Sequence, residues 1–295
     1  MLQRDSIFFR GRGRVRDSLR TAHSRQVRAG DNVGLLTRTA REGLPLNLAP
    51  DIFTVSGTIT ADSTCGILGS GYGTEFRCTA SSGPILDITA DKVVVDGIRF
   101  VYRAGLVSTE SLITRADRSG GYSPAALATD TELCAIRIKG SNCAIRNCWF
   151  EGFDNAILIE STGTYATVEN CYFSGRATSR LSSIYVGGNY TTIDKCYSTL
   201  SAYGVYVNAS NCSVKNSILH GVETGLFSAT ALRCRYTGND CQGSTSGADP
   251  WALVISDDTD YLTMAGNVVE SGHEGYVEQN SSQFASNIGT YVVVA

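Results

Sequence analysis

Short segments with the same order of apolar and polar positions recur along the chain from residue 94 to residue 289. Eight of them align, and their first residues are all apolar: Val95, Ile145, Val168, Ile193, Val214, Tyr236, Met264 and Phe284. Their fourth residues form one column: Ile98, Cys148, Cys171, Cys196, Ser217, Asn239, Asn267 and Asn287. From Cys148 onward the spacings in this column are 23, 25, 21, 22, 28 and 20 residues. A period of about 22 residues is typical of a solenoid, in which each repeat packs on the next one.

The third position of each unit predicts a sharp corner in the backbone. Gly or Asn occupies it in six of the eight units: Gly97, Asn147, Asn170, Asn216, Gly238 and Gly266. These two residue types enter the left-handed helical region at the lowest cost. About seven residues after each unit comes a second strand with a period of two: 136–138, 157–159, 184–186, 205–207, 226–228 and 253–255. Each coil is therefore expected to contain several short strands, and successive coils to lie about 4.8 Å apart.

These repeated units resemble a known family. With Cys148, Cys171 and Cys196 in one stacked column, they look like the right-handed parallel β-helix of the pectin-lyase-like superfamily, and most like its phage virion and tailspike members. The run 65–76, followed by 85–88 and 93–95, is similar to the first complete coil of that family. The resemblance implies an all-β chain with an irregular N-terminal arm and cap over 1–54 and a single-stranded β-helix over 55–295. It does not select an activity, because the family includes pectate lyases, polygalacturonases, epimerases, phage tailspikes and inert virion parts.

Composition agrees with one continuous core. The chain has 295 residues, of which 42% are apolar, and no apolar run approaches the length that spans a membrane. The N-terminal residues lack the apolar segment and cleavage site of a secretory signal, so we expect synthesis and folding in a host cytoplasm.

Ten cysteines raise the question of disulfides or a metal site. Because three of them occupy one inward column, reduced and buried thiols are favoured over a disulfide framework. No CxxC motif occurs and the three histidines are scattered, so neither a metal nor another cofactor is expected.

Residues 1–41 form a basic arm. They contain ten Arg, no Lys and three Asp, a net charge of +7, so the rest of the chain carries −10. We weighed docking on an acidic surface of another virion protein, a cap over the first coil, and contact with nucleic acid, in that order of preference. The docking hypothesis assigns an interface role to Arg10, Arg12, Arg14 and Arg16.

The middle residues of the second strands are expected to point outward, yet most are apolar. Leu158, Tyr185, Tyr206 and Phe227 form the longest such strip, here called the outer strip. Exposed apolar patches usually mark interfaces, so we expect the strip in a homotrimer interface, the alternative being that loops fold back over it. A parallel row comes from the fifth position of each unit: Arg99, Trp149, Tyr172, Tyr197 and Ile218.

Three insertions, 101–135, 174–183 and 242–252, leave from the same repeat position and should emerge on one face. We expect a ligand or partner contact from residues that they carry: Arg103, Arg115, Arg118, Tyr122, Arg176, Arg180 and Trp251. Plain loop decoration is the alternative.

Catalytic candidates are sparse. His273 beside Glu274 could abstract a proton from a uronic acid, and Asp257 could meet Glu278 across adjacent coils. A solvated turn is the favoured explanation of these residues. Asp257-Asp258, His220 and Arg137-Ile-Lys139 match the residue types of polygalacturonases in reversed chain order, so the family's roles are not transferred to them.

The first functional hypothesis is a bacteriophage virion structural protein, such as a capsid decoration, spike or adhesin, anchored by its basic arm. Its expected partners are two further copies of the chain, other virion proteins through residues 1–41, and a cell-surface polysaccharide. The second hypothesis is a polysaccharide lyase, hydrolase or epimerase that acts on an acidic glycan, as in a tailspike depolymerase. A cytoplasmic binding scaffold is a third.

Overall fold

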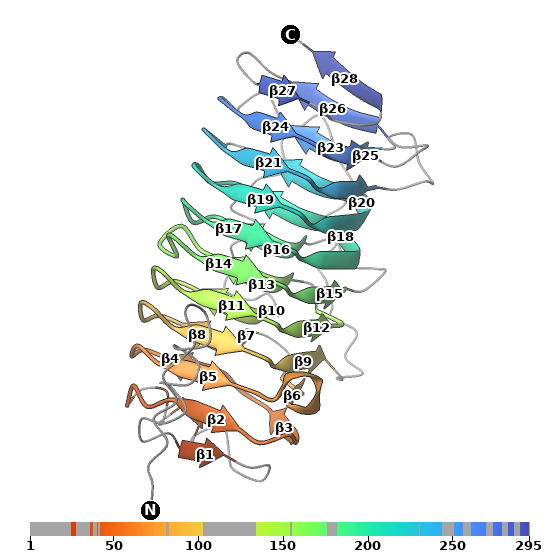
Figure 1. Ribbon diagram of the computed structural model, residues 1–295. Coiled ribbons are helices and arrows are strands. Elements are labelled where there is room, and N and C mark those ends of the chain that lie inside the picture. Colours follow the sequence, from red (N-terminus) through yellow and green to blue (C-terminus); the bar gives the residue numbers. More distant parts are fainter. Residues whose placement is uncertain are drawn as a thin grey trace, which may run out of the picture.

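Parallel strands stack along one axis in the computed structural model, with β1 and β28 at opposite ends of the stack (Figure 1). The structure describes residues 25–27, 36–37, 40, 42–80, 83–102, 134–153, 155–175, 182–229, 231–243, 251–255, 261–269, 274–278, 283–285 and 290–294. The predicted all-β parallel β-helix is confirmed. Within the described part of the chain, no helix is long and apolar enough to cross a membrane.

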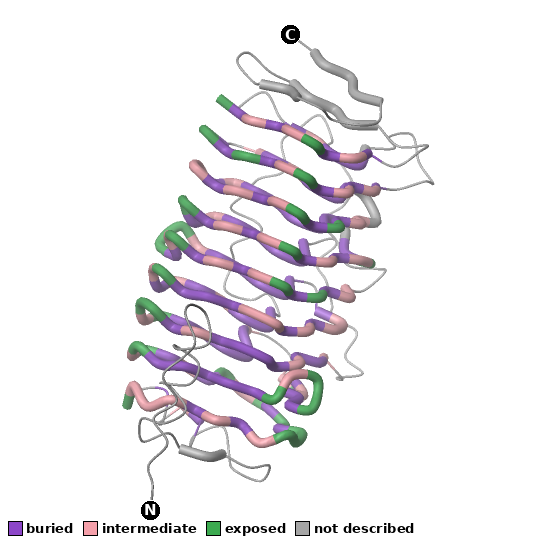
Figure 2. Tube along the Cα trace, viewed as in Figure 1, coloured by how far each residue is buried: buried purple, intermediate pink, exposed green. Residues whose placement is uncertain are grey.

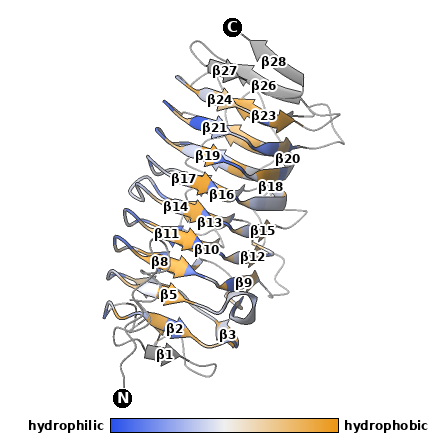
Figure 3. Ribbon diagram, in the orientation of Figure 1, coloured by the Kyte–Doolittle hydropathy of each residue, from blue (hydrophilic) through white to orange (hydrophobic). Residues whose placement is uncertain are grey.

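Sheet A contains the strand that opens each repeat unit. Its eleven strands are β1 (Arg25–Val27), β2 (Leu46–Leu48), β5 (Gly66–Leu68), β8 (Val94–Asp96), β11 (Ala144–Arg146), β14 (Thr167–Glu169), β17 (Thr192–Asp194), β19 (Ser213–Lys215), β21 (Arg235–Thr237), β24 (Thr263–Ala265) and β27 (Gln283–Ala285). Figure 3 shows hydrophobic residues along β8, β11, β14 and β17. The middle residues from Val95 to Met264 are buried and in register, as the apolar first position predicted.

Two further ladders complete each coil. Ladder B holds β3 (Ile52–Val55), β6 (Glu75–Cys78), β9 (Arg99–Tyr102), β12 (Trp149–Glu151), β15 (Tyr172–Ser174), β22 (Asp240–Gln242) and β25 (Val268–Val269). Ladder C holds β4 (Ile59–Ala61), β7 (Pro84–Ile88), β10 (Cys134–Ile138), β13 (Asn155–Ile159), β16 (Ser182–Val186), β23 (Trp251–Ile255), β26 (Glu274–Glu278) and β28 (Thr290–Val294). The long strands β18 (Tyr197–Val207) and β20 (Ile218–Ser228) run through both ladders and join them into one 17-stranded sheet.

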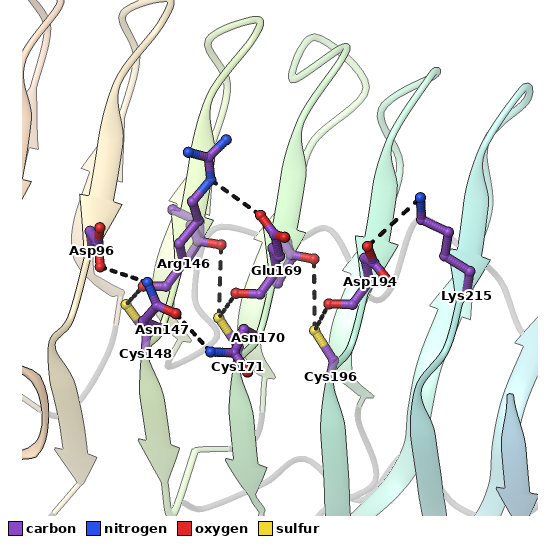
Figure 4. A network of polar contacts seen from close by, with 12 residues as sticks. Asp96, Arg146, Asn147, Cys148, Glu169, Asn170, Cys171, Asp194, Cys196 and Lys215 are labelled. Carbon is purple, nitrogen blue, oxygen red and sulfur yellow. Dashed lines mark hydrogen bonds and ion pairs between the residues drawn. The ribbon is translucent and has the colours of Figure 1, made fainter. Parts of the chain in front are cut away.

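The predicted corner after each sheet A strand is present. Its residues have φ values between 50° and 70°: Gly97, Asn147, Asn170, Lys195, Asn216, Gly238 and Gly266. The asparagines also tie successive corners together, as Figure 4 shows. Asn147 Nδ2 donates to Asp96 Oδ1 at 2.9 Å, and Asn170 Nδ2 donates to Asn147 Oδ1 at 2.7 Å. Asn at this corner therefore both adopts the left-handed backbone conformation and forms a hydrogen bond along the stack.

Cys148, Cys171 and Cys196 stack inside the corner as buried free thiols, which confirms the prediction for this column. Burial, together with the two neighbouring thiols, raises the pKa of Cys171 well above its usual value. The column continues with buried amides, where Asn239 Nδ2 donates to Asn267 Oδ1 at 3.0 Å. A second column of buried cysteines, Cys143, Cys212 and Cys234, precedes sheet A and was not recognised in the sequence.

The N-terminal boundary lies earlier in the chain than the repeat units suggested. Strands β1, β2 and β3 already belong to the stacked sheets, so parallel stacking extends to the N-terminal side of residue 55. Leu36 and Ala40 are buried in the main core. These contacts favour a capping role for that part of residues 1–41.

The outer strip is not open to solvent. Leu158 and Tyr185 are 4% exposed and Tyr206 is 1% exposed within a single chain, so the expectation of an exposed strip is wrong. These residues pack in a second apolar cluster together with Tyr203, whose ring lies edge-on to Tyr206 at a centroid distance of 5.6 Å. A partner chain is not needed to shield the strip, and its role in a homotrimer interface stays a prediction.

The cysteine column gives a direct test of the register. Cys171→Asp should prevent folding, because a charge buried without a partner destabilises by several kcal/mol. Cys171→Ala should remain folded and lose about 1–2 kcal/mol of unfolding free energy. Circular dichroism and denaturant titration would measure both effects. A stably folded Cys171→Asp protein, or rapid labelling of all ten cysteines in the native protein, would contradict this register.

Candidate functional site

A row of aromatic side chains runs along the outer face of ladder B. Trp149, Tyr172 and Tyr197 occupy the fifth repeat position and pair in register on β12, β15 and β18. Together with Tyr72, from the short 3-10 helix Gly71–Gly73, we call them the aromatic row. In contrast to the outer strip, this row remains open, since Tyr72 is 57% exposed and Tyr172 is 37% exposed.

The rings contact one another along the solenoid axis. Tyr172 and Tyr197 stack with centroids 5.1 Å apart and an interplanar angle of 1°. Tyr72 meets Trp149 edge-on at 5.8 Å, and the His220 ring lies 5.9 Å from Tyr197. Burial is the first cause that raises the pKa of Tyr172, followed by the neighbouring Tyr197 and Glu151. The Tyr172 hydroxyl therefore stays protonated near neutral pH and can donate a hydrogen bond.

A second outward row accompanies the aromatic row two residues further along each strand. It consists of side chains that are able to form hydrogen bonds: Glu151, Ser174, Thr199, His220 and Gln242. Strand alternation explains the arrangement, because the intervening residues Phe150, Phe173, Leu219 and Cys241 are buried in the main core. Aromatic surface and polar groups thus lie side by side on one solvent-facing surface.

One end of the aromatic row is closed by ion pairs. The Arg99 guanidinium forms two hydrogen bonds to Glu151, of 2.8 Å and 2.7 Å, and a third of 3.0 Å to Glu75 Oε2. The Cζ atom of Arg99 lies 4.3 Å from the centre of the Tyr72 ring. Arg77 Nε donates to Glu75 Oε1 at 2.8 Å. The hydrogen bond to Glu151 is the largest of the causes that raise the pKa of Arg99. The guanidinium of Arg99 is therefore already paired with two carboxylates.

Arg137 and Lys139 form a separate ion-pair cluster on ladder C. Arg137 donates to both carboxylate oxygens of Asp87 at 2.9 Å, and Lys139 Nζ lies 3.8 Å from Glu160 Oε1. The hydrogen bond to Asp87 raises the pKa of Arg137. The Arg-x-Lys sequence therefore binds carboxylates of its own chain.

The insertions leave beside the aromatic row. Segments 103–133, 176–181 and 244–250 each connect a ladder B strand to the ladder C strand of the same coil, so they share one repeat position as predicted. Trp251 begins β23. The other contact candidates lie outside the described residues: Arg103, Arg115, Arg118, Tyr122, Arg176 and Arg180.

Most of the remaining site residues expected from the sequence, in the basic arm and near the C-terminus, lie outside the described residues. They are Arg10, Arg12, Arg14, Arg16, His273 and Asp257. Glu274 and Glu278 are the end residues of β26, where the backbone of Glu274 pairs with Trp251 and Thr290. Among the described residues, no group of three or more His, Cys, Asp or Glu could hold a metal ion.

Comparison with known proteins shows similarity in fold alone. No protein-family model matches the sequence, and no curated protein sequence matches it. An alginate lyase from Paenibacillus sp. strain FPU-7 has a TM-score of 0.62 at 12% identity, over 92% of this chain and 99% of that one. The enzymatically active domain of bacteriophage CBA120 tailspike protein 2 has a TM-score of 0.61 at 12% identity, over 88% and 43%.

The Dettilon tailspike protein has a TM-score of 0.58 at 12% identity, over 89% of this chain and 58% of that one. The chain thus spans about half the length of the tailspike chains to which it is similar. The fold is a parallel β-helix, as the repeat units predicted, and tailspike proteins, an alginate lyase and a pectate lyase share it.

The Arg99 cluster can be tested by a double-mutant cycle. Arg99→Met should lower the unfolding free energy by about 2 kcal/mol, because Glu75 is almost fully buried and keeps only Arg77 as a partner. Adding Glu75→Gln should recover part of this loss, since the stranded charge is removed. Denaturant unfolding of the four proteins would measure the coupling. Strictly additive effects would show that the cluster does not act as a unit.

Proposed function

We propose that this chain is a bacteriophage virion protein of the tailspike type, whose β-helix binds a cell-surface polysaccharide along the aromatic row. The observation that carries the proposal is the open row of Trp149, Tyr172 and Tyr197 beside a parallel row of hydrogen-bonding side chains. Sugar rings have apolar faces and a rim of hydroxyls, so they suit a surface with both kinds of group. A row that repeats once per coil suits a polymer that runs along the solenoid.

Tailspikes among the similar structures support the virion assignment. The strongly basic N-terminal segment supports attachment to an acidic surface of another virion protein, through Arg10, Arg12, Arg14 and Arg16. The proposal includes a homotrimer in which three copies of the chain lie side by side. Sedimentation of the purified chain tests this oligomeric state.

An enzyme that cleaves or epimerises a polysaccharide is the second candidate. The alginate lyase in the comparison favours it, because the chain covers 99% of that protein. Release of reducing ends or of unsaturated uronates from bound polysaccharide would distinguish this enzyme from a binding protein.

Truncation of the aromatic row should weaken glycan binding without unfolding the chain. Trp149→Ala and Tyr172→Ala should each reduce affinity about tenfold, which corresponds to about 1.4 kcal/mol of lost contact. Binding to an array of bacterial surface polysaccharides, followed by calorimetry on the best binder, would measure this. Tyr165→Ala is the matched control, because Tyr165 is also an exposed tyrosine but lies in the turn between β13 and β14. Figure 2 shows exposed residues at the turns along one edge of the stack. Equal losses in the row and the control would contradict the proposed site.

Attachment to the virion should depend on the first 24 residues and not on Leu36 and Ala40, which pack in the core. Replacing Arg10, Arg12, Arg14 and Arg16 by Ser should leave the β-helix folded and abolish co-sedimentation with virus particles. Attachment of the unchanged chain should weaken as salt screens the arginines. Attachment by the fourfold variant at the level of the unchanged chain would exclude docking through this segment.

A further inference from the structure

Two buried polar atoms lie without a hydrogen-bond partner at the end of the aromatic row opposite Arg99. They are His220 Nε2 and Asp240 Oδ1. Within the described part of the chain, Arg146 Nε is the third such atom, but it lies 3.6 Å from Glu169 Oε2 in an ion pair. Buried polar groups in native proteins nearly always have a partner, so each exception calls for an explanation, and a bound ligand at the surface is one.

Both residues face outward on adjacent coils. Asp240 is opposite Ile218 in the ladder between β20 and β22, and His220 is opposite Gln242. The His220 ring also continues the aromatic contacts beyond Tyr197. The two unpartnered groups are thus diagonal neighbours on the surface that carries the aromatic row.

The charges of the described residues along the row favour one kind of ligand over another. Carboxylates lie at both of its ends, Glu75 and Glu151 beside Arg99 and Asp240 beside Ile218. A polyuronate would bring like charges toward these groups and would find Arg99 already bound to two carboxylates. A sugar hydroxyl, by contrast, donates readily to a carboxylate oxygen and can exchange a hydrogen bond with an imidazole nitrogen.

From these contacts we infer that the aromatic row takes a neutral, hydroxyl-rich glycan, whose hydroxyls bind Asp240 Oδ1 and His220 Nε2. The inference rests on the proposed function and specifies its ligand. Both residues are only half-buried as a whole. Rotation about the last side-chain torsion of His220 turns Nε2 toward the ligand, whereas the two equivalent oxygens of Asp240 exchange places when its carboxylate turns.

The test compares neutral and uronate-containing polysaccharides of similar length, with calorimetry on the full chain. The unchanged chain should bind a neutral polysaccharide at least tenfold more tightly than any uronate polymer. Asp240→Asn and His220→Leu should each weaken that binding at least fivefold. Their unfolding midpoints should stay the same or rise, because His220→Leu removes an unpartnered buried group and Asp240→Asn removes the charge from one. Tyr165→Ala should change neither quantity.

The possible outcomes distinguish failure of the neutral-glycan inference from failure of the proposed function. Preferential binding of a uronate polymer would overturn the neutral-glycan inference and leave glycan binding in place. Neutral-glycan binding that both variants retain, or lowered unfolding midpoints with intact binding, would overturn the anchoring role of Asp240 and His220. If no polysaccharide binds at all, the proposed function itself fails.

Discussion

Parallel hydrogen bonding between successive coils is the constraint on which the rest of the structure depends. In-register pairing places equivalent residues of neighbouring coils about one strand spacing apart, so a residue type repeated in the sequence becomes a stack in space. The left-handed corner after sheet A maintains this register, because Gly97, Asn147, Asn170 and their equivalents all turn the chain at the same repeat position. A substitution at one repeat position therefore alters the packing of the coils on both sides.

The same stacking has opposite consequences inside and outside the solenoid. Inside, it aligns Phe100, Phe150 and Phe173, whose rings stack with centroids 5.1 Å and 4.9 Å apart, and it aligns the thiols of Cys148, Cys171 and Cys196. Outside, it aligns charges, and like charges in adjacent coils would repel. Opposite charges pair along the stack, as in Asp96, Arg146 and Glu169 on sheet A (Figure 4) and in Glu75, Arg99 and Glu151 near the aromatic row. Glu169 and Asp194 are neighbours of like charge, and each has a cation on its other side, Arg146 and Lys215.

Two apolar rows lie on the outside of the solenoid, and the packing around each row places it in a different environment. The outer strip of ladder C is shielded within its own chain, where Tyr203 packs against Tyr206 and Phe227. The aromatic row of ladder B keeps Tyr72, Tyr172 and the neighbouring Ile218 substantially exposed. The ladder B face therefore provides an apolar surface available to a ligand, with polar groups beside it and carboxylates at its ends.

The sequence by itself determined the solenoid, the corner, the inward cysteine column and the position at which insertions leave, because each is a local pattern repeated once per coil. It also identified both outward apolar rows. It did not distinguish the buried row from the open one, since shielding of Leu158 and Tyr185 depends on packing beyond the strand that carries them. The partners of Arg99 and Arg137, and the absence of partners for His220 Nε2 and Asp240 Oδ1, likewise emerge only when distant segments stack side by side. Periodicity shows which residues share a face, whereas tertiary packing decides which of those faces remain open to solvent.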